Sequence, residues 1–306
     1  MSASQESPVT NESVNYTEEL PHIPSTLKVI PLMLRPRFGQ SQSSKRDVPN
    51  LTLKVHGVKF DSKKMSAYNK VCQFADPQKV SCTYPHVVAF PLHMKMLTHP
   101  EFPYPTAGLV HLSNTLTQYR QLEQHEVFDV ECQMSTQRES AKGFEFDFVT
   151  LYHCGGKLVW EGKSTYLRKA KTSQSSANKA KPKNANLAEG FTNHQIITLA
   201  SNLGRQYAKV SGDINPIHMY DLTAKLFGFK QAIIHGMWSK ARSIAALEPY
   251  FETENFSVHV DFKLPVLLPA TVKLNWNESA EGIDILLTNE SSTKPHVSGK
   301  VTFLSK

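Results

Sequence analysis

The sequence contains no long apolar run and no apolar N-terminal leader. None of its 306 residues lies in an apolar stretch close to the roughly 18 residues that a membrane-spanning helix needs. The first 25 residues are polar, carry acids and lack the hydrophobic segment of a secretory signal, which is typical of a disordered tail. We therefore expect residues 1–48 to be a disordered or extended segment, and we expect a cytoplasmic protein without a membrane partner.

Cysteine is scarce and widely spaced, which argues against several metal and redox sites. The four cysteines form no Cys-x-x-Cys pair, so a zinc ribbon is unsupported and a reducing compartment is expected. They are predicted to be buried structural thiols: Cys72, Cys82, Cys132 and Cys154. The Gly-x-Ser-x-Gly pattern of a serine nucleophile is also missing, so covalent catalysis has little support.

Positive charge is concentrated in one short segment. The formal net charge is +7, and residues 168–186 hold six lysines and arginines but no acid. The rest of the chain is almost neutral, which argues against a nucleic-acid partner. Residues 170–186 are rich in Ser, Asn and Ala, as a solvated linker would be. Attraction of an anionic ligand or an acidic carrier protein is the alternative.

The two sides of this linker resemble each other, which indicates an internal duplication. Three segments recur in the same order, namely 68–71 with 207–210, 110–111 with 258–259, and 162–169 with 299–306. The spacing from the first tyrosine to the last glycine is 94 residues in one copy and 92 in the other. We predict an N-terminal unit at residues 49–169 and a C-terminal unit at residues 187–306.

Each unit is predicted to contain one long helix followed by antiparallel strands. Apolar residues at helical spacing favour helices at 84–97 and 236–250, with Pro249 near the end of the second. Alternating or apolar runs indicate strands at 110–116, 126–135, 144–154 and 157–167, and again at 256–264, 271–276, 282–287 and 296–304. A helix wrapped by a sheet, twice over, is an α+β arrangement.

The candidate chemistry lies in two motifs of the second unit. Residues 212–218 are Gly-Asp-Ile-Asn-Pro-Ile-His, and residues 233–238 are Ile-Ile-His-Gly-Met-Trp. Asp213 and His218 supply a carboxylate and an imidazole across a proline-containing turn, and Gly236 lies where the predicted helix begins. A base, an acid and an oxyanion donor are what addition of water to an activated double bond requires.

The first unit lacks this pair. Alignment of the repeated tyrosines places Phe74 opposite Asp213 and Lys79 opposite His218. We therefore expect one active site, in the second unit, with the first unit shaping it or binding substrate.

Two alternatives remain open for these residues. In the first, Asp213 caps a short helix near residues 220–227 and His218 is a surface residue. In the second, Asp213, His218 and His235 bind a metal ion, although their spacing matches no common zinc pattern. No metal is predicted, because of this spacing, and the helix start at His235 and Gly236 favours a functional site over the first alternative.

The two motifs and their surroundings resemble the MaoC-like (R)-specific enoyl-CoA hydratases, also called hydratase 2. The matching segments of the second unit are 211–218, 224–229 and 234–238, followed by Phe-Lys-Leu-Pro at 262–265 and Leu-Pro at 268–269. In the first unit, Tyr-Pro-His at 84–86, Phe-Pro-Leu at 90–92 and Gly-Leu-Val-His-Leu at 108–112 are similar to the amino-terminal domain of two-domain members. The resemblance covers roughly residues 50–306.

The resemblance implies a double hot-dog fold, in which two antiparallel sheets each wrap a central helix. It implies that Asp213 and His218 are the catalytic pair and that Gly236 is the oxyanion-hole glycine. Asn215 falls on the family's amide position and is expected to orient the loop. Further substrate contacts are expected at His235 and at flanking lysines that face the CoA phosphates, although a solvated surface is equally compatible for each lysine: Lys225, Lys240 and Lys263.

The implied activity is that of a hydro-lyase, which reversibly hydrates trans-2-enoyl-CoA to (R)-3-hydroxyacyl-CoA without a cofactor beyond the thioester carrier. We expect Asp213 to act as base and His218 as acid, although joint titration leaves their roles open. The alternatives are a (3R)-hydroxyacyl-carrier-protein dehydratase, a thioesterase and a non-catalytic acyl-thioester-binding protein. The sequence leaves a monomer and a homodimer open.

Overall fold

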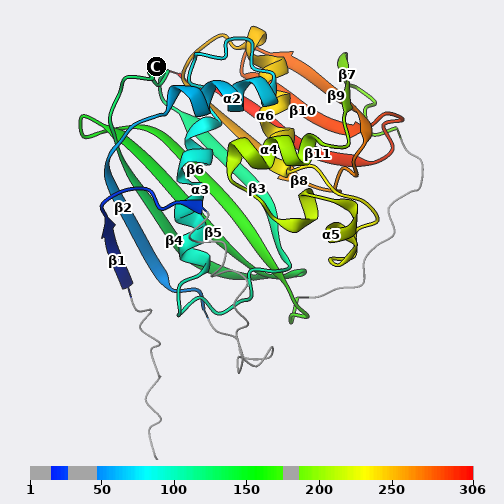
Figure 1. Cartoon of the computed structure of the whole chain (residues 1–306). Coiled ribbons are helices and arrows are strands. Elements are labelled where there is room, and N and C mark those ends of the chain that lie inside the picture. The colour runs from blue at the N-terminus through cyan, green and yellow to red at the C-terminus, as the bar shows by residue number, and fades with distance from the viewer. Residues whose placement is uncertain (1–14, 27–46, 175–185, 306) are drawn as a thin grey trace, which may run out of the picture.

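The computed structural model describes residues 15–26, 47–174 and 186–305, and within them the strands form one continuous sheet (Figure 1). The eleven strands follow the order β1-β2-β4-β5-β6-β3-β8-β11-β10-β9-β7. Their bounds are β1 Asn15–Leu20, β2 Asn50–Val58, β3 Leu109–Gln118, β4 Phe128–Ser140, β5 Gly143–Cys154, β6 Lys157–Lys169, β7 Asn193–Leu199, β8 Phe256–Phe262, β9 Ala270–Ser279, β10 Gly282–Asn289 and β11 Pro295–Phe303.

The two halves of the chain contribute to this sheet in the same way. The first half supplies β2-β4-β5-β6-β3, and the second supplies β7-β9-β10-β11-β8, so each strand has a counterpart at the same place in its own half. The equivalent strands β3 and β8 pair with each other in antiparallel register, with Leu116 opposite Val258. The two predicted sheets are therefore joined at this central pair into one continuous sheet.

The helices lie on one side of the sheet (Figure 1). They are α2 Ser62–Cys72, α3 Tyr84–Leu97, α4 Leu203–Ser211, α5 Asp221–Lys225 and α6 Gly236–Leu247, with short 3-10 turns η1 Pro216–His218 and η2 Glu248–Tyr250. The predicted helix at 84–97 is confirmed, and the one at 236–250 ends earlier, at Leu247. The 3-10 turn that follows contains Pro249, whose missing N–H cannot continue the helical hydrogen bonding.

Helices α3 and α6 are the buried helices of the first and second half, and equivalent residues of the two halves contact each other. Eleven of the fourteen residues of α3 are buried, as are ten of the twelve of α6, which fits helices covered on several sides. The repeated tyrosines, Tyr68 of α2 and Tyr207 of α4, are both buried, and their ring centroids lie 6.0 Å apart. The sequence repeat therefore corresponds to packing between matching elements.

The N-terminal segment is more ordered than the sequence suggests. Residues 15–20 form β1, which pairs in parallel with β2, while residues 1–14 lie outside the described part of the chain. Tyr16, Leu20 and Ile23 pack against the core, and Glu18 forms a 3.1 Å ion pair with Lys95. The expectation of a disordered tail is thus wrong for residues 15–25, because their few apolar side chains find buried partners.

Two further expectations are only partly addressed. Most of the basic linker predicted at residues 170–186 falls at 175–185, outside the described residues. Within the described ranges, no helix is both long and apolar enough to cross a lipid bilayer.

Lys240 connects α6 to both halves of the sheet. It is fully buried, and its Nζ donates to the main-chain oxygen of Asn114 at 3.0 Å, to Asn114 Oδ1 at 2.6 Å and to the Val258 oxygen at 2.9 Å. The Asn114 amide in turn donates to Ser164 Oγ at 3.0 Å. Burial lowers the pKa of Lys240 to about 7, yet three acceptors match the three donors of its ammonium form.

We expect Lys240→Met to destabilise the fold by about 1–3 kcal/mol, because it keeps the volume but leaves buried acceptors without a donor. Urea unfolding followed by circular dichroism would measure the change in unfolding free energy. The matched control is Lys300→Met on β11, an exposed position where we expect a change within about 0.5 kcal/mol. Equal stability of the two variants would show that the buried bonds contribute nothing net.

Candidate active site

The first motif begins where helix α4 ends. Gly212 is the C-cap of α4, and its N–H donates to the Ala208 oxygen at 2.9 Å. Its φ of +76° is in the left-handed region, which glycine adopts without the strain of a side chain. The helix therefore stops abruptly, and Asp213 follows in the turn.

Local hydrogen bonds hold the turn in shape. Asp213 Oδ1 accepts the Asn215 N–H at 3.2 Å, and Asn215 Oδ1 accepts the Ile217 N–H at 3.3 Å, which caps the η1 turn. Asn215 therefore caps the turn that follows it, and its expected part in binding substrate stays a prediction. The alternative in which Asp213 caps a short helix is wrong, because α5 has Tyr220 as its N-cap and no side-chain cap.

His218 lies inside the molecule with one nitrogen engaged. Its side chain is buried, and Nδ1 lies 2.8 Å from the Ile233 carbonyl oxygen. A carbonyl can only accept, so Nδ1 carries the proton and Nε2 presents a lone pair when the ring is neutral. Burial lowers the pKa of His218, with Asp213 acting against it, so the ring is neutral at neutral pH. The surface alternative is therefore wrong.

His235 binds the two motifs together. Its ring stacks on His218 with centroids 3.6 Å apart, and its Nε2 donates to the Asp213 main-chain oxygen at 2.8 Å. Burial lowers the pKa of His235 to about 3, and its covered Nδ1 has no hydrogen-bond partner among the described residues. These contacts position the turn, whereas the predicted contact of His235 with substrate stays a prediction.

Gly236 is the first residue of α6, directly after the N-cap His235. Its N–H therefore lies at the positive end of a twelve-residue helix, and no carbonyl in the described part of the chain accepts it. A Cβ at this position would lie only 2.9 Å from a ring carbon of Phe262, so the aromatic ring fills the space that a side chain would need.

Asp213, His218 and His235 each present a ligand-type atom, and these atoms all lie within 4.8 Å of one another. Three ligand atoms are enough for a metal site. However, the two imidazoles are stacked with planes 25° apart, so a metal between their planes would lie outside the ring plane in which a nitrogen lone pair points. The arrangement suits a hydrogen-bonded water better than a coordinated cation.

The flanking lysines differ in their surroundings. Lys225 is exposed at the end of α5, and Lys263 is exposed and forms a 2.9 Å ion pair with Asp261. Both can be reached from solvent, so their contact with phosphates stays a prediction. The same prediction is wrong for Lys240, because that ammonium is fully buried and all its donors are used inside the protein.

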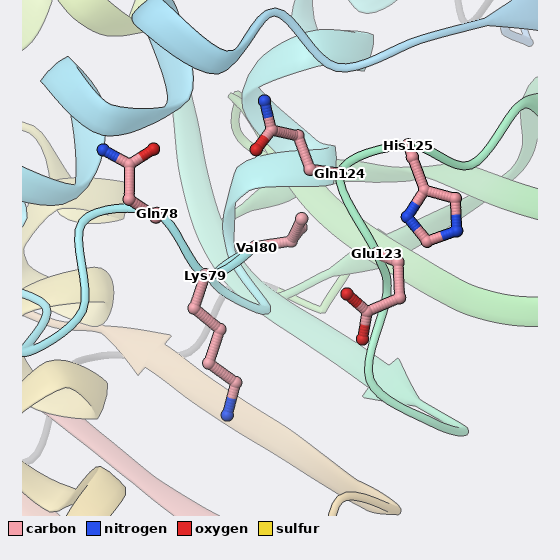
Figure 2. Close-up of a pocket in the computed structure, with 6 residues that line it drawn as sticks. All are labelled: Gln78, Lys79, Val80, Glu123, Gln124 and His125. Atoms are coloured by element: carbon pink, nitrogen blue, oxygen red, sulfur yellow. The ribbon is translucent and has the colours of Figure 1, made fainter.

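A separate surface cavity of about 380 Å³ lies in the first half (Figure 2). The stretch Gln78, Lys79, Val80 faces the stretch Glu123, Gln124, His125 across it. None of the motif residues lines this cavity. Asp213, with its side chain 32% exposed, is instead the part of the acid–base cluster that faces solvent.

Sequence reasoning missed several residues that complete the site. Ile233 belongs to the second motif, but its role as acceptor for His218 depends on a backbone oxygen that has no sequence signature. Phe262 belongs to the segment 262–265 that matched the family, and this was an available signal. Tyr166 was visible only as a repeat position, and His111 as a repeat position within the family-matching segment 108–112, yet the Asp213 charge acts on both.

Comparison with known proteins identifies the family. The profile of the MaoC like domain matches residues 183–294. The 3-hydroxyacyl-thioester dehydratase X of Mycobacterium tuberculosis is 34% identical over 256 residues, which are 83% of this chain and 90% of that protein. The chain belongs to the MaoC-like dehydratase family. It is accordingly an enzyme of that family, with the resemblance read from the two motifs confirmed.

Solved structures of this family have the same fold. HtdX of Mycobacterium tuberculosis superposes with a TM-score of 0.71 at 30% identity, covering 83% of this chain and all of that one. A MaoC-like dehydratase from Phytophthora capsici has a TM-score of 0.68 at 17% identity and covers 85% of this chain and 96% of that one. The MaoC-like hot-dog fold is therefore shared over most of the chain.

Five of the histidines with lowered pKa make stability depend on pH: the buried His86, His93, His218 and His235, and the partly buried His111. Burial lowers the pKa of each below its ordinary value of 6.5, to about 4 in His93 and about 3 in His111 and His235. Below pH 6.5 the unfolded chain binds protons that the folded chain does not, so stability falls as pH drops toward 3–4. Each histidine contributes up to about 1.4 kcal/mol per pH unit.

Urea unfolding between pH 7.5 and 5 would measure this slope. The slope of the unfolding free energy against pH measures how many more protons the unfolded chain binds. We expect His93→Gln, which removes one of the five groups, to reduce this number by about one. Exposed His194→Gln is the control and is expected to leave the slope unchanged. A pH-independent unfolding free energy in the wild type would contradict the neutral state of these rings.

We expect Gly236→Ala to destabilise the protein by about 1–3 kcal/mol despite the better helix propensity of alanine, because the new methyl group overlaps the Phe262 ring. Thermal unfolding would test this together with the double variant Gly236→Ala/Phe262→Leu. We expect the double variant to be as stable as Phe262→Leu alone, because alanine at position 236 no longer meets the ring. Strictly additive effects would mean that the ring is not the obstacle.

Proposed function

We propose that this protein reversibly hydrates trans-2-enoyl thioesters to (R)-3-hydroxyacyl thioesters, with CoA as the carrier. The observation that carries the proposal is the convergence of Asp213 and His218, whose polar atoms lie within 4.8 Å, beside the helix start at Gly236. In this view each half is one hot-dog unit, residues 49–169 and 187–306, and only the second retains the acid–base pair.

The Gly236 N–H is proposed to bind the thioester oxygen. Water adds to the β-carbon of an enoyl thioester, and negative charge then develops on that oxygen as an enolate forms. An N–H without a protein partner at the positive end of a helix stabilises such a charge. The Phe262 ring, packed against Gly236, excludes water from that side. The attraction between the Gly236 N–H and the developing charge is therefore screened less.

Asp213 and His218 are proposed to hold one water between them. Two hydrogen bonds of about 2.8 Å each let a single water bridge atoms up to 4.8 Å apart. His218 is neutral with its lone pair on Nε2, so it is suited to take the proton from that water. This reverses the roles expected from sequence, in which Asp213 was the base.

The proton balance follows from this arrangement. His218 removes a proton from water as the oxygen bonds to the β-carbon, and the C=C electrons move to form the enolate. The proton on the acid–base pair then passes to the α-carbon, and His218 returns to its neutral form. Asp213 orients the water and stabilises the transient imidazolium. Dehydration is the same path in reverse.

A carrier-protein thioester is the second candidate for the same chemistry, because the relative in Mycobacterium tuberculosis is described only as acting on 3-hydroxyacyl thioesters. A thioesterase shares the fold at lower similarity, as the 12:0-acyl-carrier-protein thioesterase of Umbellularia californica has a TM-score of 0.52 at 10% identity. Fold alone therefore does not separate these activities. A cytoplasmic location, the contacts of the basic linker, and a monomer or homodimer stay predictions.

We expect Asp213→Asn to lower kcat by at least about 10²-fold while leaving the fold intact, because the amide preserves the shape of the side chain but removes the negative charge that stabilises the transient His218 imidazolium. The assay follows the ultraviolet absorbance of the conjugated enoyl thioester with crotonyl-CoA and a longer enoyl-CoA. Exposed Asp284→Asn on β10 is the matched control.

A thiol reagent in the same assay separates hydration from hydrolysis. Loss of absorbance without release of free CoA supports the proposal, and chiral analysis of the product should give the (R) alcohol. Stoichiometric thiol release would instead identify a thioesterase, and near-wild-type hydration by folded Asp213→Asn would refute the assigned acid–base pair.

A further inference from the structure

A surface loop follows His218 directly. It spans residues 219–232 and contains α5, and hydrogen bonds close it at its base. His218 Nδ1 donates to the Ile233 oxygen at 2.8 Å, and the Ile233 N–H donates to the Ile217 oxygen at 3.1 Å. Compact surface loops whose ends meet are frequently functional. The position of this loop is therefore set by the same bonds that hold His218.

Further bonds inside the loop fix α5 against the first motif. Thr223 Oγ1 donates to the Pro216 oxygen at 2.6 Å, and the Asp221 carboxylate accepts the Ala232 N–H at 2.8 Å. Only Ala224 of α5 is buried. The helix thus has a fixed place beside the candidate site, while most of its surface remains in solvent.

The solvent side of this loop is apolar. Four of the ten exposed large hydrophobic residues in the described ranges lie within 220–227, and two of them are the most exposed of all, Leu226 at 80% and Leu222 at 75%. Leu222 and Leu226 are four positions apart in helical backbone, so their side chains lie on one face. We call Tyr220, Leu222, Leu226 and Phe227 the α5 patch. Single exposed leucines are common, whereas grouped apolar side chains mark an interaction surface.

Cations surround the α5 patch. Lys225 and Lys230 are exposed within the loop, and the Arg205 guanidinium lies over the Tyr220 ring, 4.8 Å from its centroid. None of the three forms an ion pair with a carboxylate in the described part of the chain. The single acid of the loop, Asp221, already accepts a main-chain N–H. Positive charge around apolar side chains is complementary to a partner that presents acids around apolar side chains.

We propose that the α5 patch docks a small acidic carrier protein that holds the acyl thioester, so the enzyme accepts carrier-bound substrates as well as CoA thioesters. The inference rests on the proposed hydration of enoyl thioesters and names a macromolecular partner for it. A carrier must deliver its thioester to the entrance of the site, and the patch begins two residues after His218. A CoA thioester brings no protein surface to cover these side chains, so the patch serves carrier-bound substrates.

The experiment compares hydration of one acyl group on two carriers, crotonyl-CoA and crotonyl-loaded bacterial acyl carrier protein. We expect Leu222→Ser/Leu226→Ser to raise KM for the carrier-bound substrate by about tenfold, because a few apolar anchors supply much of the binding energy of an interface. Its kcat/KM for crotonyl-CoA should change less than about twofold. Both leucines are exposed, so serine leaves the fold intact.

The charges are tested separately. Lys230→Glu should lower kcat/KM for the carrier-bound substrate by about fivefold at low salt, and the loss should shrink at high salt because ions screen exposed charges. Ile196→Ser on β7 is the matched control, an exposed apolar residue outside the patch, and it should behave as wild type with both substrates.

Each other occupant of the patch predicts a different result. A dimeric wild type that becomes monomeric in the leucine variant, measured by size-exclusion chromatography with light scattering, would assign the patch to a second copy of the chain. Wild-type binding to vesicles with anionic lipids that the variant loses would assign it to a lipid surface. Either result overturns the carrier proposal, as does an equal loss of activity on both substrates.

The proposed function is judged independently. An enzyme that hydrates crotonyl-CoA but not the carrier-bound substrate overturns the docking surface and leaves the hydratase assignment intact. The same conclusion follows if the leucine variant hydrates the carrier-bound substrate with an unaltered KM. Absence of hydration of both substrates by the wild type removes the proposed function and this inference with it.

Discussion

The candidate site depends on a reciprocal pair of hydrogen bonds between its two motifs. His218 of the first motif donates to the Ile233 oxygen of the second, and His235 of the second donates to the Asp213 oxygen of the first. Each bond uses one nitrogen of the imidazole, and the other nitrogen of the neutral ring keeps a free lone pair. The same contacts that join the segments therefore set the tautomers, and stacking of the rings keeps both imidazoles in place.

The first half supports this arrangement although it lacks the acid–base pair. Its helix α2 ends at Gln73 in a left-handed conformation with φ of 61°, matching Gly212 in the second half. The next residue is Phe74, which is buried against Tyr68, where the second half has Asp213. One copy of the turn has thus become part of the core, while the other presents a carboxylate.

Contacts between the halves connect the first half to the candidate site. The Lys240 ammonium holds α6 to β3 and β8, and α6 carries the Gly236 amide at its start. His111 and Tyr166 reach the other side of the site through Phe262. Both halves therefore set the position of the Gly236 amide and of the Phe262 ring that packs against it.

The sequence by itself determined the repeated α+β units, the two long helices and the eight predicted strands, because hydrophobic periodicity and duplicated segments are local signals. It also identified Asp213, His218 and Gly236 as a group, since glycine, proline and helix-start positions limit the backbone near them. Lys240 was misjudged as a phosphate ligand, because a lysine has the same local pattern in a core as on a surface. Only the tertiary structure decided that the halves share one sheet, which nitrogen of each histidine is free, and that His111 approaches the site, because these depend on distant backbone carbonyls and on rings brought together by folding.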